Sequence, residues 1–297
     1  MMEKENDEST AADDAEKVDA AIQLLTKGNA NDAAKLLLDV IQRTPKPYVR
    51  EFEADGKRYV RFWDAEEFMH FVTDQREHIK CELIWLKSAY PRAFYYMGFL
   101  LVKAGDPTSA IKLLDAGYQV EAHPMFLLEK GKALSMLKRH QESIACYEAA
   151  FNHQGIVRAT VRAVALRGKG VQLIDLNRLD EAEQVFEASL KLDPNNHVAL
   201  NELQYISRLR RGAPPAPLET IATGAQGLVC AICGNPLEGG GKVHNIDGRV
   251  VLRCEKCAAL LPGTGGSPAL PAAASGANIH FTGKKPEPKR WWQFWRK

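Results

Sequence analysis

The sequence predicts a mainly α-helical protein, an α-solenoid of stacked helical hairpins that carries an inserted β-hairpin and a small C-terminal module. Residues 14–211 have helical periodicity, and four segments in this region repeat one spacing of small and large residues. The interruption at about 46–63 has the alternation and the turn residues of a β-hairpin. Four of the six cysteines lie together between residues 230 and 257. These observations separate the chain into a helical region and a cysteine-containing module.

Composition and charge argue against several classes of protein. The 297 residues are 45% hydrophobic and 26% charged, as in ordinary soluble domains, and the net charge of +2 gives no argument for nucleic acid. Residues 1–13 are acidic and polar, so we expect a disordered N-terminus without a secretory signal. No run of about 18 apolar residues predicts a membrane span. We therefore expect a cytoplasmic protein with reduced thiols, which disfavours disulfides.

A fixed spacing of small and large residues recurs in the helical region. A small residue is followed by a large one after three positions, by a small one after twelve and by a large one after sixteen. Small residues let two helices approach closely, and large residues fill the space beside them. A single hairpin cannot bury its apolar faces, so such hairpins stack. The four segments with this spacing begin at Ala21, Gly98, Gly131 and Gly170.

This spacing resembles that of the tetratricopeptide repeat. The stretch NRLDEAEQVFEASLKLDP, residues 177–194, is the nearest match, and Pro45 and Pro194 stand where the family has proline. The spacing from Gly131 to Gly170 is 39 residues, against 33 from Gly98 to Gly131, which predicts long helices around 151–165. After Pro194, the stretch HVALNELQYISRLRRG predicts a closing helix.

The interruption predicts a β-hairpin followed by a helix. Alternating residues flank an Asp55-Gly56 turn signal. Asp64, with Glu67 three positions on, predicts a capping box that opens a long helix to about Tyr90. The hairpin is either a decoration of the repeats or a lip beside a binding groove.

The resemblance also places a partner-binding groove on the first helices of the repeats. Its candidates form an aromatic end and a basic end. Aromatic residues at this helical spacing also suit a packed core, which is the alternative interpretation. Family members that bind a chaperone's C-terminal carboxylate have Lys and Asn where this chain has aromatic residues, which disfavours that ligand. The candidate groove residues are Tyr95, Phe99, Leu128, Lys132 and Arg167.

No catalytic motif is evident in the sequence. It lacks a nucleophile-elbow motif, a zinc-protease motif and a phosphate-binding loop, and its eight histidines are scattered. We therefore expect a protein that is not an enzyme.

The cysteine module follows a linker at 212–227 and occupies residues 228–261. Two C-x-x-C pairs are separated by 20 residues, and the intervening stretch predicts a second β-hairpin. Four thiolates complete a tetrahedral site, so the pattern predicts one structural zinc ion and resembles a zinc ribbon. The expected ligands are Cys230, Cys233, Cys254 and Cys257.

Other uses of these cysteines fit the sequence less well. A rubredoxin-like iron site would need a glycine after Cys257, where this sequence has alanine. A thioredoxin-like site needs βαβ units that are not predicted. His244 could replace one thiolate, although four thiolates already suffice. Cys81 and Cys146 are expected inside helices as small buried residues.

A second linker at 262–283 leads to a basic, tryptophan-rich tail at 284–297. On a helix its aromatic residues would share one side, which predicts salt-sensitive binding to anionic membranes. Docking in a pocket of a partner or of the solenoid is the main alternative, and an inert tail is the third. The tail residues concerned are Trp291, Trp292, Phe294, Trp295, Lys289, Arg290, Arg296 and Lys297.

Together these features predict a non-enzymatic scaffold or adaptor. Its partner would be a protein or a peptide, held by the repeats, with the zinc module and the tail adding contacts. The expected location is cytoplasmic, with possible peripheral contact at the inner face of the membrane. The alternative is a nucleic-acid-associated regulator that uses the zinc module and the basic tail. The charges of residues 228–257 are mixed, which makes nucleic acid the less favoured partner.

Overall fold

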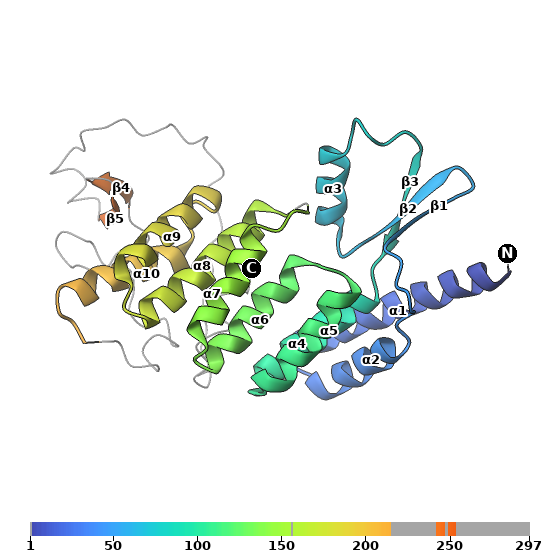
Figure 1. Ribbon diagram of the computed structural model, residues 1–297, viewed down its shortest axis with the longest axis horizontal. Helices are drawn as coiled ribbons and strands as arrows, with labels where there is room; N and C mark the ends of the chain where they lie inside the picture. Colours follow the sequence, from blue (N-terminus) through green and yellow to red (C-terminus); the bar gives the residue numbers. More distant parts are fainter. Residues whose placement is uncertain (1, 156, 215–241, 247–248, 254–297) are drawn as a thin grey trace. The chain divides into compact units, whose positions relative to one another are not determined.

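The computed structural model describes residues 2–155, 157–214, 242–246 and 249–253 (Figure 1). The chain divides into two compact units, Met1–Asp193 and Pro194–Lys297. No helix in the described part of the chain is long and apolar enough to cross a membrane.

The first unit is a mainly α-helical repeat array with a small three-stranded sheet inserted near the N-terminus. Its helices form successive pairs, as the small-and-large spacing predicted (Figure 1). The pairs in the described residues are α1 (Met2–Thr26) with α2 (Ala30–Gln42), α4 (Tyr90–Ala104) with α5 (Pro107–Val120), α6 (Pro124–Met136) with α7 (His140–Phe151), and α8 (Ala159–Asp175) with α9 (Leu179–Leu192).

Each later pair is closed by a glycine on its first helix against a large side chain on its second. A Cβ atom added to Gly98 would lie 2.4 Å from Leu114 Cδ2, a distance that no packed structure tolerates. The two helices can pack this closely only because Gly98 has no side chain. This confirms the prediction that the small residues of the spacing allow close helix packing. The equivalent distances are 2.8 Å from Gly131 to Tyr147 Cζ and 2.6 Å from Gly170 to Phe186 Cε2.

Tyr147 of α7 packs against two different helices. Its buried ring lies against Gly131 of α6 on one side and against Gly168 of α8 on the other, where an added Cβ would lie 2.5 Å from the ring. One aromatic ring thus joins the two halves of its own hairpin and the next hairpin.

The first helices of neighbouring pairs also contact each other. Helix α4 contacts α6, and α6 contacts α8, whereas the second helices α5, α7 and α9 make no comparable contacts among the described helices. The first helices therefore lie closer together and form the inner side of the array, as in other helical repeat proteins.

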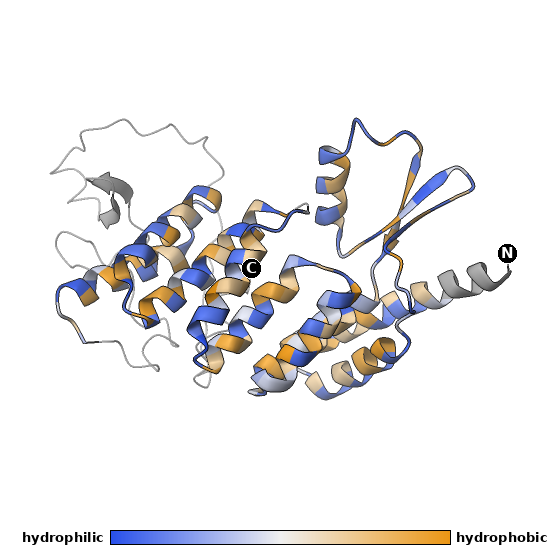
Figure 2. Ribbon diagram, viewed as in Figure 1, coloured by the Kyte–Doolittle hydropathy of each residue, from blue (hydrophilic) through white to orange (hydrophobic). Residues whose placement is uncertain are grey.

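The insertion is a three-stranded sheet with one helix. Strand β1 (Glu51–Ala54) pairs antiparallel with β2 (Lys57–Phe62), and β2 pairs in parallel with β3 (Glu82–Lys87). Helix α3 (Ala65–Asp74) connects the two parallel strands and turns its hydrophobic side toward them (Figure 2). The hairpin prediction is confirmed, but the sequence did not predict the third strand.

The long helix expected from Asp64 to about Tyr90 is wrong. Helix α3 ends at Asp74, and the apolar run that follows forms β3 because it pairs with β2. Cys81 consequently precedes a strand and does not lie in a helix, whereas Cys146 lies in α7; both side chains are partly buried.

Two other boundaries differ from the predictions. Helix α1 begins at Met2, although residues 1–13 were expected to be disordered; this segment has no Gly or Pro and contains the helix-forming residues Met, Glu and Ala. The extra residues of the 39-residue spacing are shared between a helix and a loop. Helix α8 has 17 residues, against 13 in α6, and the remaining extra residues lengthen the connection between α7 and α8, where Gly155 disfavours a continuous helix.

The second unit contains the predicted helix α10 (His197–Arg210) and two strands. Strands β4 (Lys242–Ile246) and β5 (Arg249–Arg253) pair antiparallel, with Lys242 opposite Arg253. This pairing confirms the second predicted hairpin. The four zinc-ligand candidates and the tail at 284–297 lie outside the described residues.

Candidate functional site

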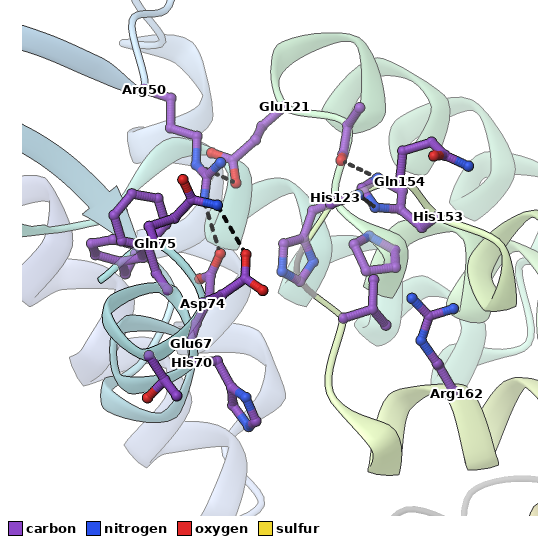
Figure 3. A pocket seen from close by; sticks show the side chains of 17 residues that line it. Arg50, Glu67, His70, Asp74, Gln75, Glu121, His123, His153, Gln154 and Arg162 are labelled. Carbon is purple, nitrogen blue, oxygen red and sulfur yellow. Dashed lines mark hydrogen bonds and ion pairs between the residues drawn. The ribbon is translucent and has the colours of Figure 1, made fainter. Parts of the chain in front are cut away.

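A cleft of about 860 Å³ opens between the insertion and the repeats of the first unit (Figure 3). Helix α3 forms one wall, and the connections before α6 and α8 form the other. The side chains that give the walls their chemistry are Glu67, His70 and Asp74 on α3 and His123, His153 and Arg162 on the repeat side.

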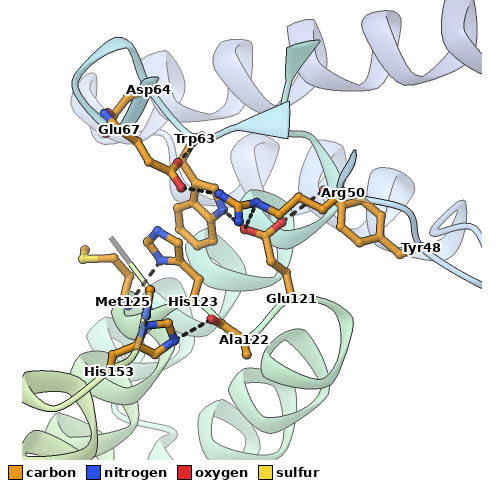
Figure 4. A network of polar contacts seen from close by, with 11 residues as sticks. Tyr48, Arg50, Trp63, Asp64, Glu67, Glu121, Ala122, His123, Met125 and His153 are labelled. Atoms are coloured by element: carbon orange, nitrogen blue, oxygen red, sulfur yellow. Dashed lines mark hydrogen bonds and ion pairs between the residues drawn. The ribbon is translucent and has the colours of Figure 1, made fainter. Parts of the chain in front are cut away.

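Glu121, between α5 and α6, joins the insertion to the repeats (Figure 4). Its carboxylate accepts hydrogen bonds from Tyr48 Oη at 3.1 Å and from Trp63 Nε1 at 3.0 Å. Arg50 Nε lies 3.9 Å from the same carboxylate. The side chain of Glu121 is only 8% exposed, so these contacts replace its hydration.

The environment of Glu121 also changes its protonation. Burial raises the pKa of its carboxyl to about 7, the positive charge of Arg50 acts in the opposite direction, and the nearby negative charge of Glu67 raises it further. Protonated and ionised forms of Glu121 therefore coexist near neutral pH.

Trp63 is the hydrophobic centre of this junction. Its ring stacks on His123, with ring centroids 3.9 Å apart, and meets Phe126 edge-to-face at 5.6 Å. Burial lowers the pKa of His123 well below its usual value, with smaller contributions from positive neighbours. His123 is thus neutral, and its Nδ1 accepts a hydrogen bond from Met125 N at 3.3 Å, which places the ring proton on Nε2.

The start of α3 is capped as the sequence predicted. Glu67 N donates to Asp64 Oδ1 at 2.8 Å, and Glu67 Oε2 accepts from the backbone N–H of Trp63 at 2.7 Å. The glutamate therefore reaches one residue beyond the N-cap. Arg158, in the connection before α8, forms ion pairs with Glu66 at 2.5 Å and with Asp64 at 3.5 Å, so the two walls are linked at this end.

The repeat wall is held together by histidine contacts. Gly155 N donates to His153 Nδ1 at 3.0 Å, which leaves Nε2 to donate to Ala122 O at 2.8 Å. Beside this loop, Arg162 donates to Phe151 O and lies over the Phe151 ring. Within the described residues, no carboxylate forms an ion pair with Arg162. Its guanidinium therefore brings to the cleft a positive charge that no described carboxylate contacts directly.

The candidate groove residues do not line this cleft. They lie on the first helices of the repeats, where Lys132 Nζ contacts Glu129 Oε2 at 2.7 Å and Arg167 Nη1 contacts Asp193 Oδ2 at 2.9 Å. Most of these side chains are buried, as the core interpretation expects, and a partner-binding role for them stays a prediction. The buried ones are Tyr95, Leu128, Lys132 and Arg167, and Phe99 is half-buried.

Sequence reasoning did not identify the cleft. Its walls are far apart in the sequence, and its histidines match no motif. The 39-residue spacing was the available signal, because some of its extra residues form the connection that carries His153. Among the described residues, no group of three or more His, Cys, Asp or Glu side chains is arranged to hold a metal ion.

The stacked helical pairs define a helical repeat protein, and family comparison identifies the repeats. Residues 97–155 and 169–196 match two family models that are both described as tetratricopeptide repeat. These two segments are thus identified as tetratricopeptide repeats, which confirms the resemblance seen in the sequence for this part of the chain. No curated protein matches the chain.

Several solved structures are similar to parts of the chain. The first tetratricopeptide domain of Spaghetti (RPAP3), bound to an HSP90 peptide, is 24% identical, covers 41% of this chain and 95% of its own, and has a TM-score of 0.37. The Pseudomonas aeruginosa PilF structure is 14% identical, with coverages of 73% and 83% and a TM-score of 0.48. MamA from Desulfovibrio magneticus is 17% identical, with coverages of 68% and 88% and a TM-score of 0.44. The assignment therefore rests on the family matches.

Proposed function

We propose that this chain is a non-enzymatic scaffold that binds a peptide or a partner protein. The observation that carries the proposal is the repeat array itself, in which a glycine packs against a large side chain in three successive helical pairs and Tyr147 joins two of them into one frame. Repeat arrays of this kind present extended surfaces built from several hairpins. A rigid frame of this type suits partner binding.

The cleft beside α3 is the proposed contact point for the partner. Its volume of about 860 Å³ suits a short peptide segment, since ligand pockets commonly range from about 300 to 1,000 Å³. The walls have unlike charges, with Asp74 on α3 facing the side that carries Arg162. Arg162 would pair with an acidic side chain of the partner, because a guanidinium binds carboxylates through directed hydrogen bonds.

Replacing Arg162 with glutamine is expected to weaken capture of the partner at least about tenfold, since a charge-assisted contact is worth roughly 1.5–3 kcal/mol. The measurement is affinity purification from a lysate of the source organism, with quantitative mass spectrometry of the captured proteins. Arg178→Gln is the matched control. Arg178 is an exposed arginine that pairs with Glu181, and it is not among the residues that line the cleft.

Proteins that are retained by wild type and Arg178→Gln but lost by Arg162→Gln would support the cleft. Equal capture by all three versions would contradict it. Thermal unfolding of each version separates a binding effect from a loss of folding, because Arg162 also donates to Phe151 O.

The C-terminal module is proposed to be a zinc ribbon. The paired strands β4 and β5 lie in the sequence between the two C-x-x-C pairs, as a ribbon requires. Cys230, Cys233, Cys254 and Cys257 would hold one structural ion.

The tail at 284–297 is proposed to bind anionic membrane surfaces. Full-length protein is expected to sediment with anionic vesicles and less with neutral ones, whereas a version that ends at Gly283 should stay in solution. The physical reason is the cluster of tryptophans among basic residues. Equal sedimentation of both versions would leave a protein pocket as the tail's target.

A further inference from the structure

One arginine lies between two buried carboxylates where the insertion meets the repeats (Figure 4). Arg50 Nη2 is 3.1 Å from Glu67 Oε1 of α3, and Arg50 Nε is 3.9 Å from Glu121 Oε1. The side chains of Glu67 and Glu121 are 13% and 8% exposed. When both carboxylates are ionised, this group therefore holds one more negative charge than positive charges in a place with little water.

The other direct contacts of Glu121 are neutral. Its carboxylate accepts hydrogen bonds from the phenol of Tyr48 and from the indole of Trp63. His123, two residues further along the chain, is also neutral, because burial lowers its pKa. The positive charge of Arg61 acts on Tyr48, but within the described residues Arg61 forms no ion pair with Glu121.

The charged groups of the neighbouring segments do not supply a second cation. Arg158, before α8, is shared by Glu66 and Asp64 at the start of α3. His153 uses both ring nitrogens in contacts with the backbone, one as acceptor and one as donor, which makes it neutral. Glu121 therefore depends for its counter-charge on Arg50, which is closer to the other carboxylate.

We propose that the junction at Glu121 is a pH-sensitive latch, which holds the insertion against the repeats when this carboxyl is protonated and loosens when it is ionised. A protonated carboxyl needs no counter-charge, and its oxygens still accept hydrogen bonds from Trp63 and Tyr48. An ionised carboxyl adds the surplus negative charge to the buried junction. Because α3 forms one wall of the cleft, loosening the latch separates the two walls. The latch acts in this way whatever the cleft binds.

The direction of the pH effect follows from the pKa of Glu121, which burial raises from its usual value of 4.5 to about 7 in the docked state. The docked state therefore binds the proton more tightly than the open state. The stabilisation of docking is complete below about pH 4.5 and is lost as the pH rises through about 7. Docking should weaken about tenfold between about pH 6 and about pH 8. Burial also raises the pKa of Glu67, so this residue acts in the same direction.

Hydrogen exchange of the Trp63 indole N–H, followed by NMR in the full chain, measures the docking, because this N–H donates to Glu121. Its protection is expressed relative to free tryptophan at the same pH. In wild type the protection should fall about tenfold from about pH 6 to about pH 8, while the helical signal in circular dichroism stays the same. In Glu121→Gln, whose amide resembles the protonated carboxyl, the fall should be less than about threefold.

Glu53→Gln is the matched control, because Glu53 is an exposed carboxylate on β1 of the same insertion, and it should keep the wild-type fall. Protection that is constant or rises with pH in wild type, a full fall in Glu121→Gln, or its loss in Glu53→Gln would each overturn the latch. If Glu121→Gln does not fold, the carboxyl carbon signal of wild-type Glu121 decides. A titration midpoint at about pH 7 supports the latch, and one at or below about pH 5 overturns it.

Discussion

Replacing Trp63 with alanine is expected to lower the free energy of unfolding by about 3–5 kcal/mol, the range for large aromatic residues in a core. Trp63 is 8% exposed and packs against His123, Phe126 and Tyr95. Its loss removes this packing and one of the hydrogen-bond donors to Glu121. Urea unfolding followed by circular dichroism measures the change.

Trp63→Phe is the matched control for the packing. It keeps an aromatic ring but lacks the Nε1–H that donates to Glu121, so a smaller loss of about 1–3 kcal/mol is expected. Amide exchange should become faster in β1, β2 and β3 of the alanine variant, because the insertion loses its main contact with the repeats. A loss below about 1 kcal/mol for Trp63→Ala would show that the junction does not stabilise the fold.

Replacing Cys230 with serine is expected to abolish zinc binding, from about one ion per chain to none, because serine is a poor substitute for a thiolate ligand. Zinc contributes roughly 10–16 kcal/mol of apparent binding free energy in small modules of this kind. Residues 228–261 should therefore unfold, while the helical signal of the repeats stays nearly unchanged. Elemental analysis and circular dichroism measure the two effects.

Cys146→Ser is the control for the zinc experiment. Cys146 is a partly buried cysteine of α7 that belongs to neither C-x-x-C pair, so its replacement should leave the zinc content unchanged. Wild-type protein that contains no zinc, or a Cys230→Ser variant that retains it, would contradict the four-thiolate site.

The helical repeats could be predicted from the sequence because their information is local. Each of the three later hairpins places its glycine and its large residue sixteen positions apart, as in Gly98 and Leu114, and the structure brings these two into direct contact. The hairpin of β1 and β2 could also be predicted from the sequence, since Asp55 and Gly56 form its turn.

Strand β3 and the cleft could not be predicted in this way. The run ELIWLK suits a buried helix or a strand, and only its pairing with β2 decides between them. The cleft depends on contacts between distant residues, such as Arg158 with Glu66, which lie 92 positions apart. The spacing of residues within one helix or strand gives no information about such a contact.

The position of Tyr147 affects how the repeats come apart. Its ring fills the space above Gly131 in its own hairpin and above Gly168 in the next one. If either hairpin opened alone, the ring would lose its contacts with that hairpin, so opening one hairpin weakens the next. We therefore expect the centre of the array to unfold as one cooperative unit, with fraying at its ends.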